Sequence, residues 1–114
     1  MQFLLITHVD ETGWPQLTPA QQEQGLAAYA AFVQDLSAKG ALVASGRLAP
    51  SAGARVVRVK DGRRQVVDGP FAETKEVLAG YFLIEASDLD AAVDWAARCP
   101  ASGHGAVEVR ALWA

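Results

Sequence analysis

Apolar runs separated by two amphipathic segments predict a domain of mixed strands and helices. The first run, Phe3–Ile6, indicates a strand that is apolar on both faces. A helix is expected to begin at Pro19, with Thr18 as its N-cap and Gln21 completing a capping box. Apolar side chains then recur at three- and four-residue steps, and a glycine suited to a helix end follows them: Leu26, Tyr29, Val33 and Leu36, then Gly40.

The middle of the chain predicts a strand followed by a β-hairpin. Residues 41–48 form the expected strand, which Gly46 interrupts. Two alternating runs, 55–60 and 63–68, flank Asp61-Gly62, a dipeptide typical of a two-residue type I′ turn. Such a turn fixes the register of the hairpin, and four pairs should face each other: Lys60 with Arg63, Arg58 with Gln65, Val57 with Val66, and Arg55 with Asp68.

The last third of the chain predicts a strand, a helix and a closing strand. Residues 77–85 are apolar on both faces, with Tyr81 and Phe82 on opposite sides. Ser87 or Asp88 is the expected cap of a helix that Pro100 ends. The closing strand, 106–113, should carry Val107, Val109, Ala111 and Trp113 on one face and Glu108 and Arg110 on the other.

This order of elements predicts an α+β fold, a ferredoxin-like split βαβ antiparallel sheet with an inserted β-hairpin and helices on one face. The strands at 3–6 and 77–84 are apolar on both faces, so the face without helices needs a second cover. The simplest cover is the same sheet of another subunit. We therefore predict a homodimer.

Composition removes several classes of function. The chain of 114 residues is long enough for one domain, and its net charge of −3 does not favour binding to a nucleic-acid backbone. No apolar run approaches the roughly 18 residues of a membrane span, and no secretory signal pattern is present. The single cysteine cannot form an intramolecular disulfide. We expect a soluble, cytoplasmic protein that binds neither nucleic acid nor membranes.

The segment 68–76, Asp-Gly-Pro-Phe-Ala-Glu-Thr-Lys-Glu, carries more charge than a connection between two strands needs. Together with residues 78–84, 96–100 and 107–110 it resembles the DGPF-domain branch of the YCII-related family over essentially the whole chain. The resemblance implies one domain over residues 1–114 and a dimeric α+β barrel-type assembly. It also implies a cleft between sheet and helices that this loop lines.

Relatives in the wider superfamily include dehalogenases and muconolactone-type isomerases, which transfer a proton next to a carbonyl. Members of the DGPF branch are often encoded beside sigma factors of the extracytoplasmic type. The resemblance therefore implies two classes of function, a small enzyme and a regulatory partner.

Four side chains are candidates for proton transfer. Glu73 and Glu76 would share one side of a single helical turn, where their repulsion favours binding of a proton; the alternative is a solvated acidic loop. Asp68 is a candidate general base, or it pairs with Arg55 across the hairpin. His8, at the end of the first strand, suits acid–base chemistry, with a non-catalytic role as the alternative.

Five further side chains are candidates for substrate binding. Arg58, Lys75 and Arg47 would bind an anion or carboxylate if two of them converged on a cleft, and are surface charges otherwise. Tyr81 is expected to line the core or the cleft. Phe71 would be a lid or a dimer contact, but burial against the sheet is the interpretation we prefer.

No metal site and no cofactor are predicted. His8, Asp10 and Glu11 match no established ligand spacing. Haem binding ranks last, because neither histidine lies on a predicted helix. His104 is expected to be an exposed loop residue, and Cys99 a small buried hydrophobe.

Two functions remain open at this point. The first is a small-molecule-binding protein that acts as a lyase or isomerase on an anionic or carbonyl-containing substrate by proton transfer. The second is a non-enzymatic, ligand-sensing or regulatory partner, linked to an extracytoplasmic-type sigma factor. The first predicts an enclosed cleft, and the second an exposed apolar patch beyond the dimer interface.

Overall fold

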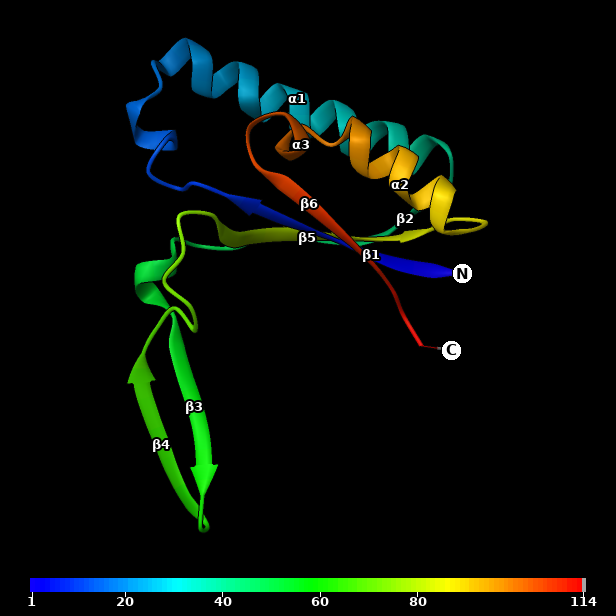
Figure 1. Ribbon diagram of the computed structural model, residues 1–114. Coiled ribbons are helices and arrows are strands. Elements are labelled where there is room, and N and C mark those ends of the chain that lie inside the picture. Colours follow the sequence, from blue (N-terminus) through cyan, green and yellow to red (C-terminus); the bar gives the residue numbers. More distant parts are fainter. Residues whose placement is uncertain (114) are drawn as a thin grey trace.

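The computed structural model, which describes residues 1–113, is an α+β fold with a four-stranded antiparallel sheet (Figure 1). Across the sheet the strands follow the order β2 (Leu42–Arg47), β5 (Val77–Glu85), β1 (Gln2–Val9) and β6 (Ala106–Ala111). One face is covered by helices α1 (Pro19–Ala38), α2 (Leu89–Arg98) and the short α3 (Ala101–His104). This is the predicted ferredoxin-like arrangement, in which the two outer strands flank the paired β1 and β5.

Helix α1 begins as its sequence predicts. The Thr18 side chain accepts a hydrogen bond from the Gln21 backbone N–H at 3.2 Å, and Gln21 Oε1 accepts one from the Thr18 N–H at 2.9 Å. After the last turn the chain reverses through Gly40, whose φ of 67° favours glycine. No helix in residues 1–113, α1 included, is long and apolar enough to cross a membrane.

The core lies between the helices and one face of the sheet. Phe3 and Leu5 of β1 and Leu36 of α1 are fully buried. Phe32, which the predicted stripe omitted, packs between the helices and the sheet. Its ring centroid lies 5.1 Å from that of Phe82 on β5 and 6.2 Å from that of Trp95 on α2, both in an edge-to-face arrangement. Leu26, a member of the predicted stripe, is half exposed.

The end of the chain differs from the prediction in two places. Asp88 caps α2 by accepting a hydrogen bond from the Ala91 N–H at 2.8 Å, but after Pro100 the chain forms the extra turn α3. Proline fits there because the first residues of a helix need no N–H partner. The closing strand ends at Ala111, so Trp113 does not continue the Val107 face and is fully exposed.

Strands β3 (Arg55–Lys60) and β4 (Arg63–Asp68) form a separate hairpin. Asp61 and Gly62 have φ angles of 52° and 73°, as a type I′ turn requires. All four predicted cross-strand pairs are present. The hairpin stands away from the sheet on the side opposite the helices (Figure 1), and we call it the arm.

The second face of the sheet has no helix over it. Cross-strand pairing places Leu4 beside Leu83 and Ile6 beside Tyr81 on this face, which we call the open face. Its β1 side chains are only partly buried, whereas Phe3, Leu5 and Thr7 on the other face are buried. The two-faced apolar sheet on which the predicted homodimer depends is thus present.

Burial should decide the cost of truncating leucines on α1. Leu36→Ala removes a fully buried side chain and should lower the free energy of unfolding by about 2–5 kcal/mol. The matched change Leu26→Ala, at a position 50% exposed on the same helix, should cost less than about 1 kcal/mol. Urea unfolding of the two variants measures the difference, and equal losses would contradict this description of the core.

Candidate functional site

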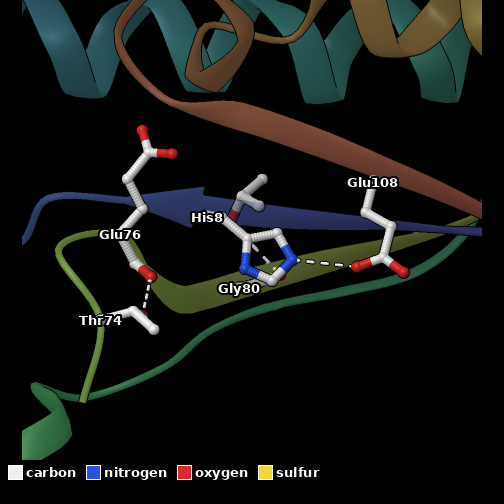
Figure 2. Close-up of polar contacts among 6 residues, drawn as sticks. His8, Thr74, Glu76, Gly80 and Glu108 are labelled. Atoms are coloured by element: carbon white, nitrogen blue, oxygen red, sulfur yellow. Dashed lines mark hydrogen bonds and ion pairs between the residues drawn. The ribbon is translucent and has the colours of Figure 1, made fainter. Parts of the chain in front are cut away.

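A histidine–carboxylate pair lies on the open face. His8 Nε2 is 3.1 Å from Glu108 Oε1, and the His8 side chain is 30% exposed (Figure 2). Among the described residues, Nδ1 of His8 has no hydrogen-bond partner. An imidazole held through one nitrogen and free at the other is arranged to accept or donate a proton.

The backbone around His8 determines this position. The β1–β5 register shifts between Thr7 and His8, and the Thr7 hydroxyl, buried on the core face, donates to the Gly80 carbonyl at 3.3 Å. A bulge of this kind re-aims the side chains that follow it. On the other side, a Cβ at Gly105 would lie 2.2 Å from the His8 carbonyl oxygen. Only glycine lets β6 start directly opposite His8, with Glu108 on the same face.

Two further polar side chains share the open face with this pair. Arg110 follows Glu108 by two residues on β6 and pairs in register with Leu4. Tyr81 pairs with Ile6, and its ring lies over Gly46, where a Cβ would be 2.7 Å from a ring carbon. The glycine that interrupts β2 therefore makes room for the tyrosine ring.

At the same end of the sheet lies an open cavity of about 500 Å³. Three segments line it: residues 10–12 after β1, Ser51 and Ala52 of the 3₁₀ helix η2 (Ser51–Gly53), and residues 68–70, 73–75 and 77. None of the three α-helices contributes to the lining. The loop thus lines a cavity in a different place from the expected cleft between sheet and helices, where side chains such as Phe32 and Leu36 are buried.

Carboxylates dominate this cavity. Four acidic side chains line it against one lysine: Asp10, Glu11, Asp68 and Glu73, with Lys75. The Glu11 carboxylate ties two of the walls together, because Oε2 accepts from the Ser51 N–H at 3.1 Å and Oε1 accepts from the Ser51 hydroxyl.

Asp10 is held ionised by its neighbours. Hydrogen bonds from the Thr12 hydroxyl at 2.6 Å and from the Thr12 N–H at 3.0 Å lower the pKa of the Asp10 carboxyl below its usual value of 3.8, with a smaller contribution from the charge of Lys75. Asp10 is therefore suited to accept hydrogen bonds from a ligand rather than to deliver a proton.

Comparison with known proteins identifies the family. The family model for the YCII-related domain matches residues 1–114. The chain belongs to the YCII-related family. An uncharacterised protein of Rhizobium meliloti (strain 1021) is 33% identical over 96 residues, which cover 84% of this chain and 77% of that protein.

Among solved structures, this YCII-related chain is similar to 5-chloro-2-hydroxyhydroquinone dehydrochlorinase from Burkholderia phenoliruptrix AC1100, solved in complex with 2,5-dihydroxybenzoquinone. The match has a TM-score of 0.58 and 17% sequence identity, and it covers 99% of this chain and 94% of the other. At this identity the match shows a common fold.

The predicted acid–base residues of this YCII-related chain do not form one cluster. Asp68 and Glu73 line the cavity, and Asp68 also pairs with Arg55 at 3.4 Å. Residues 69–76 contain no helical turn, so Glu73 and Glu76 do not share one. The Glu76 carboxylate points away from His8, while the Thr74 hydroxyl donates to the Glu76 carbonyl (Figure 2).

The predicted cations are also separate. Lys75 lines the cavity, but Arg47 lies over the Trp14 ring at 5.1 Å, and Arg58 lies over the Phe71 ring at 5.4 Å. Phe71 is 77% exposed, so the preferred interpretation of a buried phenylalanine is wrong. Its ring lies beside Arg58 of the arm rather than against the sheet.

The remaining titratable groups do not add to the site. Cys99 is buried, as predicted, and burial raises the pKa of its thiol. His104 is exposed, at the end of α3 rather than in a loop. Within residues 1–113 no three histidine, cysteine or acidic side chains gather where they could hold a metal ion.

Sequence reasoning did not select Glu108 and Arg110. The signal was available, since the alternation of β6 places both on the face opposite Val107. Only the pairing of β6 with β1 shows that this face is the one that carries His8.

The effect of Thr12 on Asp10 can be tested by titration. Thr12→Ala removes the hydroxyl donor and should raise the pKa of Asp10 towards 3.8, whereas Thr12→Ser should keep it low. A lowered pKa contributes stability that is fully present above the unfolded value and is lost as pH falls through the folded value. Relative to Thr12→Ser, Thr12→Ala should therefore lower the free energy of unfolding at neutral pH and leave it unchanged in acid below the folded pKa. NMR titration of the Asp10 carboxyl measures the shift, and identical curves for the two variants would contradict the assigned cause.

Proposed function

We propose that this YCII-related protein binds a small carbonyl-containing molecule on the open face and acts as a lyase or isomerase by proton transfer. The observation that carries the proposal is the His8–Glu108 pair, with Nε2 and Oε1 3.1 Å apart and Nδ1 free within the described residues. Family membership and the fold shared with a dehydrochlorinase support it at the level of class.

The chemistry follows from this arrangement. Nε2–H donates to Glu108, so Nδ1 is the base that removes a proton from the carbon next to the carbonyl. Glu108 stabilises the imidazolium that forms. The electron pair moves onto the carbonyl oxygen as an enolate, and the Tyr81 hydroxyl and the Arg110 guanidinium are candidate partners for it on the same face. Return of the proton at another carbon completes an isomerisation, and expulsion of a leaving group completes an elimination.

The acidic cavity narrows the substrate class. Four carboxylates against Lys75 disfavour a multiply charged anion and favour a neutral molecule whose hydroxyl groups donate hydrogen bonds. In this proposal Asp68 and Glu73 bind those hydroxyls, and Glu73 is a candidate second proton carrier. Glu76, which points away from His8, has no assigned role in the transfer.

We further propose that the open face binds a second copy of the chain, as its apolar side chains predict. A second sheet would exclude water from the His8 site and strengthen its electrostatic interactions. Partly buried Leu4, Ile6 and Leu83 would then become the centre of an interface.

The role of His8 is tested with neutral hydroxylated ketones, such as 2-hydroxycyclohexanone, as probes. The assay is NMR detection of hydrogen–deuterium exchange, in D₂O, at a carbon next to the carbonyl. His8→Gln should lower the rate by about 10²–10⁴-fold while leaving the dissociation constant of the probe nearly unchanged. His104→Gln, which changes an exposed histidine, is the matched control and should leave the rate unchanged.

A ligand-sensing role is the second candidate, favoured by the exposed valines of the arm. The same exchange experiment distinguishes the sensor from the enzyme. Binding of a probe without exchange in the unmodified protein would favour the sensor and overturn the proton-transfer proposal.

Interruption of the open face should disturb dimer formation. Leu83→Lys places a charge in the proposed interface and should weaken self-association at least tenfold. Leu26→Lys, at a half-exposed position on the helix side, should leave it unchanged. Sedimentation equilibrium measures both variants, and a wild-type protein that sediments as a monomer would refute the dimer.

A further inference from the structure

The arm contacts little of its own chain, although it carries five valines. On one face, Val57, Val59 and Val66 are 57%, 71% and 51% exposed, and Val67 on the other face is 58% exposed. An isolated two-stranded hairpin is marginally stable in water and normally needs a third strand or a packed face. The arm therefore needs a packing partner, and its own chain does not supply one.

Charge limits what this partner can be. The arm carries five basic residues and two acidic ones, namely Arg55, Arg58, Lys60, Arg63 and Arg64 against Asp61 and Asp68. Its net charge is thus +3, while the whole chain carries −3, so the remainder of the chain carries −6. A second copy of this chain presents the opposite charge to the arm.

The opposite end of the sheet has matching features. The pairs Gln2–Glu85 and Phe3–Ala111 mark that end, and the chain there turns out of the sheet (Figure 1). Leu112 is 41% exposed and Trp113 is fully exposed. The acidic residues Glu85, Asp88 and Asp90, all exposed, lie at the same end, where β5 leads into α2.

Twofold symmetry brings these two surfaces together. The arm projects on the open-face side (Figure 1). Two open faces can therefore approach only if each arm passes the end of the other sheet. With the twofold axis between the two sheets, parallel to their plane and perpendicular to the strands, the arm end of one copy meets the opposite end of the other. An arm of six-residue strands extends about 20 Å, enough to cross a sheet spacing of about 10 Å and reach the partner's flank.

We propose that the arm clasps a second copy of this chain, with the partner's Trp113 packed on the valine face. The partner's Glu85 and Asp88 then lie near Arg64, which shares that face with Val59 by register. The proposal rests on the open-face dimer proposed above and adds the contact that orients it.

This contact also completes the loop cavity. Asp68 lies on the valine face of the arm, beside Val66 and opposite Arg55, and it is at the same time a wall of the cavity. A side chain packed on Val57 and Val66 therefore lies beside the cavity mouth. In the single chain this mouth is open, so the partner's Trp113 supplies an apolar wall that a small carbonyl compound needs.

Cysteine pairs test the contact directly. In a Cys99→Ala background, Val66→Cys and Trp113→Cys are made in separate chains, mixed and oxidised. The mixture should give a covalent dimer on a non-reducing gel, and each variant alone should not. The matched pair of Val66→Cys with Ser37→Cys, an exposed position on α1, should give none.

The outcomes separate the two proposals. Crosslinking of Val66→Cys to itself, or no crosslink from a protein that sediments as a dimer, would overturn the clasp and leave the open-face dimer standing. A monomeric wild-type protein would overturn both.

A second measurement does not depend on disulfide geometry. Trp113 is fully exposed within its own chain, so Trp113→Ala should leave the unfolding of the monomer unchanged. It should weaken both self-association and binding of the neutral probe 2-hydroxycyclohexanone at least tenfold. Unchanged values for both would refute the role of the partner's Trp113 in the site.

Discussion

The pairing of β1 with β5 on one side and β6 on the other is the constraint on which the other features depend. It sends Phe3 and Leu5 to the helices and leaves Leu4 and Ile6 on the open face. The shift of register after Thr7 then determines the direction of His8. Because Glu108 reaches that histidine only through the β1–β6 pairing, the polar pair is a product of sheet register rather than of any local motif.

Both polar features of the molecule gather at one end of this sheet. The His8–Glu108 pair supplies a group that can move a proton, and the neighbouring cavity supplies carboxylates, an amine and backbone turns that can bind hydroxyls. Glu11 holds the first loop to η2 through Ser51, which gives the cavity two connected walls. A scaffold of strands thus supports loops that carry the chemistry, as in many small-molecule sites.

One-sided covering of the sheet links this site to assembly. The helices satisfy one face, and the arm extends from the other side with apolar and basic residues that its own chain leaves exposed. In the proposed dimer, a second copy would offer an apolar face to the sheet and acidic charge to the arm. Assembly and site formation would then be the same event, since Asp68 belongs to both surfaces.

Much of the fold could be predicted from the sequence, because it depends on local rules. The capping box of Thr18 and Gln21, the Asp61-Gly62 turn and the register it imposes are short-range effects, and each is present. The Arg55–Asp68 pair followed from that register. These local rules did not predict the position of the candidate site. Only the charged loop at 68–76 indicated roughly where it lies. Glu73 and Glu76 separate because no helical turn joins them, Phe71 is exposed beside Arg58 of the arm, and Glu108 joins His8 from 100 residues away. Local propensities act over a few residues, whereas these contacts depend on which strands pair and in what register, and only the tertiary structure decided that.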